Sequence, residues 1–303
     1  MTVDMRDAFF QSVYDCVKKD KNVIVITADH GAFGLTKIQN DFPKQYLNVG
    51  IAEQNMISLA AGLAACGKIV YVYSINNFIS LRSLEHVNLD LCSMELHVNL
   101  VGVGAGFTYS TDGPTHQGMQ DLQAMSVLPN LQIYNVTDEI NSYNLGKMGY
   151  IKPGPKYFRI EKGKNPRIYS DDDFTDGLKK IIHSNETLII SSGFMTHTAI
   201  KVSSMLKNVG VVDVYRVKPL NEKMLVNIVN SVKNIVVLEE ATYSGGICEK
   251  IGFLIAKNNL QCNFLPIAVK DKPCYYYGTR QMLHKKYDID ADSVYEKIIN
   301  FLR

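Results

Sequence analysis

Short apolar runs alternate with helix-period segments through the first half of the chain. The runs are rich in Val and Ile and read NVIVITAD (22–29), KIVYVYS (68–74) and HVNLVGVGA (97–105). Between them lie an Ala-rich segment at 52–67 and a second segment near 81–92, both with the apolar spacing of a helix. This alternation is typical of a largely parallel sheet with helices on both faces, so we predict an α/β fold.

The alternation is interrupted once and then resumes. Two further apolar runs, at 131–137 and 156–163, flank a helical segment near 138–148. A polar stretch, KGKNPRIYSDDDFTDG, follows, and a second cycle of strands and helices begins with ETLIISSG. We therefore predict two consecutive α/β domains, residues 1–165 and 181–303, joined by a linker at 166–180.

Charge and cysteine content narrow the class of protein. The 32 basic and 30 acidic residues are interspersed, and the net charge is only +2, which argues against a nucleic-acid or membrane partner. The six cysteines show no CxxC spacing and indicate reduced thiols. The chain starts without the pattern of a secretory signal, and no apolar run approaches the roughly 20 residues of a membrane span. We expect a soluble, cytoplasmic protein.

One candidate for chemistry is Glu53, in the segment NVGIAEQN at the start of the Ala-rich helix. Acidic residues are common in a first helical turn, where they offset the helix dipole, and from the residues alone this interpretation is favoured. The alternative is a partly buried acid that shares a proton with a basic ring nitrogen of a cofactor.

A second candidate is the segment DGPTHQG, residues 112–118, which follows the buried run at 97–105. Its Gly-Pro pair predicts a tight turn, so Asp112 and His116 can point into one cleft at the carboxyl end of a strand. A turn with ordinary surface residues is the competing interpretation. Two polar side chains on a Gly/Pro-shaped loop favour a site.

These segments together resemble a known family. GIAEQN, YVYSINNFISLRSLEHV and DGPTHQG are similar to the pyrimidine-binding domain of transketolases and of 1-deoxy-D-xylulose-5-phosphate synthases. YRVKPLNEKML and VVLEEATYSGG follow the pattern of the family's last domain. The resemblance covers nearly the whole chain and implies the C-terminal subunit of a split transketolase.

The resemblance implies a thiamine diphosphate site. Glu53 would bind N1′ of the aminopyrimidine, Phe78 would stack on that ring, and Asp29 and His30 would lie at the edge of the cofactor. For His30, a hydrogen-bonded core histidine is an equally good interpretation, and for Phe78 the alternative is simple packing.

The resemblance also implies substrate contacts. Asp112 and His116 would contact sugar hydroxyls, with His116 taking part in proton transfer. Arg6 and Arg159 would grip a sugar phosphate, for which a guanidinium fork is suited; otherwise Arg159 is a strand residue paired with Glu161 or solvent. Arg82 fits either an anion contact or a solvated helix face.

The last domain offers less chemistry. Gly245-Gly246 resembles a phosphate-binding turn, but no phosphate motif follows, so we predict that this domain supports assembly. We expect His197 at a helix start.

A partner chain is implied by what the sequence lacks. Enzymes of this class bind Mg²⁺ and the diphosphate through a Gly-Asp-Gly segment followed by an asparagine, and the two are not found together here. We expect those ligands from an N-terminal subunit, no metal ligands in this chain, and two copies of each subunit in an α2β2 heterotetramer.

Four functions remain open on the sequence. The first is ketol transfer between sugar phosphates, although Gly104-Ala105-Gly106 stands where transketolases place a substrate-contacting histidine. Gly118 and the following Asp121-Leu122 look more like the pyruvate-decarboxylating synthase. The DGPTHQ turn argues against a 2-oxo-acid dehydrogenase E1 β subunit. Glu53, Phe78 and His116 together argue against a non-catalytic relic of the fold.

Overall fold

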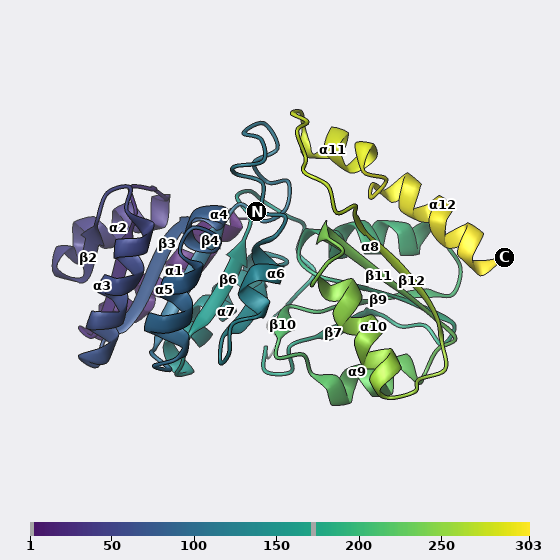
Figure 1. Cartoon of the computed structure of the whole chain (residues 1–303), viewed down its shortest axis with the longest axis horizontal. Helices are drawn as coiled ribbons and strands as arrows, with labels where there is room; N and C mark the ends of the chain where they lie inside the picture. The colour runs from purple at the N-terminus through teal and green to yellow at the C-terminus, as the bar shows by residue number, and fades with distance from the viewer. Residues whose placement is uncertain (1–2, 171–173) are drawn as a thin grey trace.

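The computed structural model describes residues 3–170 and 174–303 and shows two α/β units side by side (Figure 1). The α/β class and the two consecutive domains predicted from the sequence are confirmed. Residues 171–173 of the predicted linker lie outside the described residues.

The first sheet has seven strands in the order β10-β5-β6-β4-β3-β1-β2. Its strands are β1 (Val23–Thr27), β2 (Tyr46–Asn48), β3 (Ile69–Ile75), β4 (Val98–Val103), β5 (Gln132–Asn135), β6 (Lys156–Ile160) and β10 (Arg216–Lys218). All the pairings among β1 to β6 are parallel.

Helices cover both faces of this sheet because neighbouring strand residues point to opposite sides. The helical segments are α1 (Met5–Lys19), α2 (Phe33–Asp41), η1 (Pro43–Gln45), α3 (Glu53–Ala65), α4 (Asn76–Ile79), α5 (Leu84–His86), η2 (Val87–Cys92), α6 (Asp121–Ser126) and α7 (Glu139–Ile151). Val23 and Val25 pack with residues of α1 and α2, whereas Ile24 and Ile26 pack with Met56 of α3. The helix predicted near 81–92 is divided into α5 and the π-helical η2.

The second sheet has five strands in the order β12-β11-β8-β9-β7. They are β7 (Lys179–Ile182), β8 (Thr187–Ser191), β9 (Val209–Asp213), β11 (Asn234–Thr242) and β12 (Asn263–Val269). Its helices are α8 (Phe194–Met205), α9 (Glu222–Val229), α10 (Ile247–Lys257), α11 (Arg280–Lys286) and α12 (Ala291–Leu302).

A strand from the second half of the chain joins the first sheet. The run VGVVDVYRVKPL divides into β9, in the second sheet, and β10, which pairs antiparallel with β5 at the edge of the first sheet. The sequence did not predict this crossing, and the proposed domain limits of 1–165 and 181–303 therefore stay a prediction. A single apolar cluster also runs through both units, from Leu100 and Tyr157 to Val212 and Ile235.

Among the helices in the described ranges, none has the length and apolar character needed to cross a membrane.

Candidate active site

Glu53 is the first residue of α3 and is buried, with 3% of its surface exposed. One carboxylate oxygen accepts a hydrogen bond from Ser74 Oγ at 3.2 Å, and the other accepts from Arg82 Nη1 at 2.7 Å. Glu53 is thus both a first-turn acid and a buried carboxylate. The position in a first helical turn and the burial that a cofactor contact requires are therefore both found at Glu53, and the two interpretations do not exclude each other.

Arg82 connects Glu53 to Phe78. Its guanidinium carbon lies 4.1 Å from the centroid of the Phe78 ring, so the same group that binds the carboxylate also covers a face of the aromatic ring. The Arg82 side chain is 43% exposed. A planar ligand that stacks on Phe78 and binds Glu53 would take the place of this guanidinium.

The turn at 112–118 lies beside Phe78. The His116 ring packs edge-on against Phe78, with the centroids 5.2 Å apart. Asn77, the neighbour of Phe78 in α4, holds the turn by donating from Nδ2 to the carbonyl oxygens of Pro114, Thr115 and Gln117 at 3.1–3.3 Å. Phe78 and His116 are therefore positioned by one amide.

Glycine at position 118 is required by close packing at the base of the turn. A Cβ there would lie 2.4 Å from Asn76 Nδ2 and 2.6 Å from the carbonyl oxygen of Gly104. The same approach lets Gly118 and Gly106 exchange backbone hydrogen bonds. Asp112 lies at the exposed end of the turn.

His30 lies against Tyr73 of β3, with 5.3 Å between the ring centroids. Burial lowers the pKa of His30, and the nearby charges of Arg6, Lys162 and His116 lower it further. Its Nε2 is buried and has no hydrogen-bond partner within the described chain. This buried, unpaired nitrogen favours a ligand-facing role over that of a satisfied core histidine.

Asp29 is exposed and in the left-handed backbone region, with φ of 54°. Its side chain accepts a hydrogen bond from Asn48 Nδ2 at 3.2 Å, at the carboxyl ends of β1 and β2. The structure therefore places Asp29 on the same sheet edge as His30, where ligands of parallel sheets bind.

Arg6 and Lys162 are cations that act on this edge. Arg6 is mostly buried in α1; its Nε lies 3.8 Å from Asp7 Oδ1 and has no hydrogen-bond partner within the described chain. Lys162 is exposed, and its charge acts on His30. Sequence reasoning missed Lys162, although a cation directly after the carboxyl end of a buried strand is a recognisable signal.

Arg159 has a different partner from the one considered in the sequence analysis. It is 4% exposed; its Nε binds Asp121 at 2.9 Å and its Nη2 donates to the carbonyl oxygen of Gly118. Its partner is Asp121, not the Glu161 considered from the sequence. Burial and this pairing favour a structural role beneath the turn over a phosphate contact, because the guanidinium is already committed.

The glycine pair after β11 belongs to the protein's own helix cap. Glu239 accepts hydrogen bonds from the backbone N–H groups of Ile247 and Cys248, both at 2.9 Å. A Cβ on Gly246 would lie 2.4 Å from the Glu239 carboxylate. A carboxylate of this chain occupies the anion position at Gly245-Gly246, which favours the structural interpretation over a phosphate site. His197 lies in the first turn of α8, as predicted, and contacts the carbonyl oxygen of Thr137.

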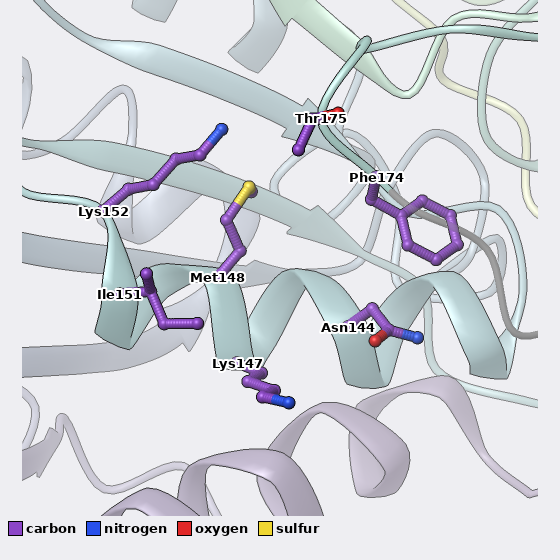
Figure 2. A pocket seen from close by; sticks show the side chains of 7 residues that line it. All are labelled: Asn144, Lys147, Met148, Ile151, Lys152, Phe174 and Thr175. Atoms are coloured by element: carbon purple, nitrogen blue, oxygen red, sulfur yellow. The ribbon is translucent and has the colours of Figure 1, made fainter.

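Glu53, Phe78, Arg82 and His116 are joined by the contacts above and form the Glu53 cluster. Figure 2 shows a separate cavity of about 250 Å³ along α7, lined by Asn144, Lys147, Met148, Ile151, Lys152, Phe174 and Thr175. It shares no lining residue with the Glu53 cluster. Within the described ranges, no group of three or more His, Cys, Asp or Glu side chains is arranged to bind a metal.

Comparison with known families agrees with the geometry. Residues 1–167 match the pyrimidine-binding domain of transketolase, and residues 179–294 match the transketolase C-terminal domain. Glu53, Phe78 and His116 all fall in the first match.

Three curated relatives cover nearly all of the chain. A putative transketolase C-terminal section from Methanocaldococcus jannaschii is 30% identical, over 99% of this chain and 96% of the relative. One of the subunits of an apulose-4-phosphate transketolase from Phocaeicola vulgatus is 26% identical, over 98% and 97%. A 1-deoxy-D-xylulose-5-phosphate synthase from Dictyoglomus thermophilum is 32% identical over 98% of this chain but only 49% of its own length.

Two solved structures have the same fold. One, described as a split gene transketolase in an inactive β4 tetramer, superposes with a TM-score of 0.88 at 26% identity and covers 100% of this chain and 99% of that one. A transketolase from Campylobacter jejuni superposes with a TM-score of 0.82 at 16% identity, over 99% of this chain and 47% of its own, and shows the fold alone. The chain therefore belongs to the transketolase family and is composed of that family's pyrimidine-binding and C-terminal domains.

Proposed function

We propose that this chain is the C-terminal subunit of a cytoplasmic, two-chain, thiamine-diphosphate-dependent transketolase that moves a two-carbon ketol unit between sugar phosphates. The observation that carries the proposal is the buried Glu53 carboxylate, which Arg82 joins to a face of Phe78, a ring that in turn packs edge-on against His116. A buried acid beside a partly exposed aromatic ring suits a basic, planar heterocycle.

The residues present fit the pyrimidine end of the cofactor. Glu53 would hold a proton against a ring nitrogen, in a site where low polarity strengthens that interaction. Phe78 would stack on the ring once Arg82 moves aside, and Arg82 is exposed enough to move. Bound there, thiamine diphosphate supplies the carbon nucleophile for ketol transfer.

The substrate side is the turn at 112–118. His116 would exchange a proton with a substrate hydroxyl, and Asp112 would accept from another. Arg6 and Lys162 would attract the phosphate, with Lys162 taking the role that the resemblance implied for Arg159. The positive charges of Arg6 and Lys162 both act on His30, and these two cations support an anionic substrate.

A partner subunit would complete the site and supply the ligands for Mg²⁺ and the diphosphate. Apolar side chains are exposed on α2, α3 and the segments beside them, at Phe33, Leu47, Ile51, Leu59 and Leu81. Exposed apolar side chains on several elements of the first unit support burial of part of this unit against another chain. The similar split-gene protein, which is described as inactive as a β4 tetramer, also supports an α2β2 active form.

A second candidate is the pyruvate-decarboxylating synthase chemistry. It is supported by the 32% identity to the Dictyoglomus synthase and by Gly118 at the end of the turn. The β subunit of a 2-oxo-acid dehydrogenase and a non-catalytic relic are less well supported, because the DGPTHQ turn and the Glu53 cluster are both intact.

Reconstitution tests the proposal. The purified chain is mixed with an N-terminal transketolase subunit, thiamine diphosphate and Mg²⁺, and ketose phosphates and pyruvate are compared as donors with aldose phosphates as acceptors. We expect turnover with a ketose phosphate and none with either chain alone. Turnover only with pyruvate favours the synthase, and none with any donor contradicts both.

A further inference from the structure

The loop from Cys274 to Gly278, which leads into α11, presents three consecutive tyrosines. Tyr275, Tyr276 and Tyr277 are 69%, 51% and 65% exposed. Exposed large side chains are ordinary, so exposure by itself assigns no role to any of the three. Their ring contacts distinguish them, because the Tyr276 ring lies under Lys286 whereas the Tyr277 ring packs on Gly113.

The loop lies against the turn at 112–118, although it belongs to the other domain. Gln117 Nε2 donates a hydrogen bond to the carbonyl oxygen of Tyr276 at 3.4 Å. A Cβ on Gly113 would lie 2.8 Å from Cε1 and Oη of Tyr277, so the tyrosine ring packs directly on the turn. Figure 1 shows the two loops rising side by side at the top of the view, one in teal and one in yellow.

Tyr277 is thereby placed next to both substrate-side residues. Gly113 follows Asp112 in the chain, and its carbonyl oxygen accepts a hydrogen bond from the backbone N–H of His116 at 3.0 Å. The Tyr277 ring packs on the residue between them and stays largely exposed, so one of its faces is available to a ligand.

The structure assigns to Tyr277 a place in the substrate site, as a specificity-determining wall for the hydroxylated chain of a sugar phosphate. The assignment rests on the proposed function and extends it, because the C-terminal domain was expected only to support assembly. Tyrosine suits this task, since its ring packs on carbon-bound hydrogens while its hydroxyl exchanges hydrogen bonds.

The charge beside the loop favours the same ligand. Lys286 Nζ lies 4.3 Å from the centroid of the Tyr276 ring. A cation among the tyrosines attracts an anionic substrate as it enters and does not suit a purely apolar occupant.

Kinetics of the reconstituted complex test the assignment. We expect Tyr277→Ala to raise KM for the aldose phosphate acceptor about five- to tenfold while kcat changes less than about twofold. Tyr277→Phe, which keeps the ring, should raise KM only about two- to threefold. Tyr275→Ala is the matched control in the same loop and should leave both constants unchanged.

A role in domain packing alone predicts a different result. In that case Tyr277→Ala lowers the unfolding temperature and leaves KM and the preference among acceptors of different length at the wild-type values. That outcome overturns the assignment.

A binding measurement tests the assignment of Tyr277 independently of the proposed function. With 3-fluorotyrosine at position 277, the ¹⁹F resonance of the complex should move and saturate as an aldose phosphate is added, and the same label at position 275 should stay still. If no donor is turned over, the proposed function fails, and this titration still decides for or against Tyr277. An unmoved resonance at 277 overturns the assignment.

Discussion

At the scale of single residues, the pairing of Glu53 with Arg82 is the feature on which the proposed chemistry depends. A buried carboxylate is costly without a partner, and Arg82 provides one that is exposed and can leave. Ser74 gives a second, neutral hydrogen bond from the end of β3. The acid is thus oriented before any ligand arrives.

Replacing Glu53 by Gln removes the acid but keeps the shape of the side chain. The amide cannot hold or release a proton at a ring nitrogen, so we expect turnover of the reconstituted complex to fall by about 10²- to 10⁴-fold. Assembly should persist, as judged by gel filtration. Ser74→Ala is the matched control and should reduce turnover far less; near-normal turnover of Glu53→Gln would contradict the role of this carboxyl.

Lys156 is a buried titratable residue that has no role in the proposed ketol transfer. It is buried at the start of β6, its Nζ donates to the carbonyl oxygen of Gly154 at 2.7 Å, and burial lowers its pKa to about 7. Between pH 7 and its ordinary pKa of 10.5, the unfolded chain binds the proton more tightly than the folded chain. The contribution of Lys156 to the free energy of unfolding therefore increases as the pH rises from 7 to 10.5.

We expect Lys156→Met to stabilise the protein near pH 8 by roughly 1–3 kcal/mol, because the cost of neutralising the buried amine disappears. Urea unfolding at several pH values measures this, and the gain should shrink toward pH 10. Lys21→Met, at an exposed lysine, is the control and should change stability little. A gain that is independent of pH would argue against a buried neutral amine.

At the scale of elements, helix α10 begins on a carboxylate from the strand before it. Glu239 satisfies two N–H groups that have no partner within the helix, from inside the core. The Glu239 carboxylate fills the space beside Gly246, so a side chain at position 246 would collide with it.

We expect Glu239→Ala to lower the free energy of unfolding by about 2–4 kcal/mol, because it leaves buried donors unpaired. Glu239→Gln keeps one acceptor oxygen and should cost less. Glu249→Ala, which removes an exposed acceptor for the Gly245 N–H, is the matched control and should cost under about 1 kcal/mol. Equal effects at the two sites would contradict the buried cap.

At the scale of the whole molecule, one guanidinium ties the two units together. Arg280, at the start of α11, binds both oxygens of Glu161 at 2.9 and 2.6 Å and also binds Glu240, which pairs with His284. Glu161 follows β6 of the first sheet, and Glu240 lies on β11 of the second. The same residue anchors the end of the tyrosine loop.

We expect Arg280→Met to destabilise the protein by about 3–5 kcal/mol at neutral pH, because two buried carboxylates lose their cation. The charge of Arg280 holds the pKa of Glu240 well below its ordinary value of 4.5. Stability from this carboxylate is therefore present above pH 4.5 and is lost as the pH falls below it. Calorimetry should show the difference between variant and wild type shrinking in acid; a constant difference would contradict the ion pair.

Local pattern accounts for much of what was predicted. Most strands of both sheets were located because buried parallel strands read as apolar runs, and several helices because their period differs. Three strands were not located: the short β2, β7, which begins within the predicted linker, and β12. The turn at 112–118 was located because glycine and proline restrict the backbone locally. The pairing of Arg159 with Asp121 was not predicted, because the sequence of a strand does not show which buried acid will face it.

The sequence by itself determined the α/β class, the two cycles of strands and helices, and which short segments carry the candidate chemistry, since these depend on neighbouring residues. Only the tertiary structure decided that Arg82 binds Glu53, that β10 crosses to the first sheet, and that Tyr277 packs on Gly113. Those contacts join residues far apart in the chain. They are selected by the packing of whole elements, which local periodicity does not encode.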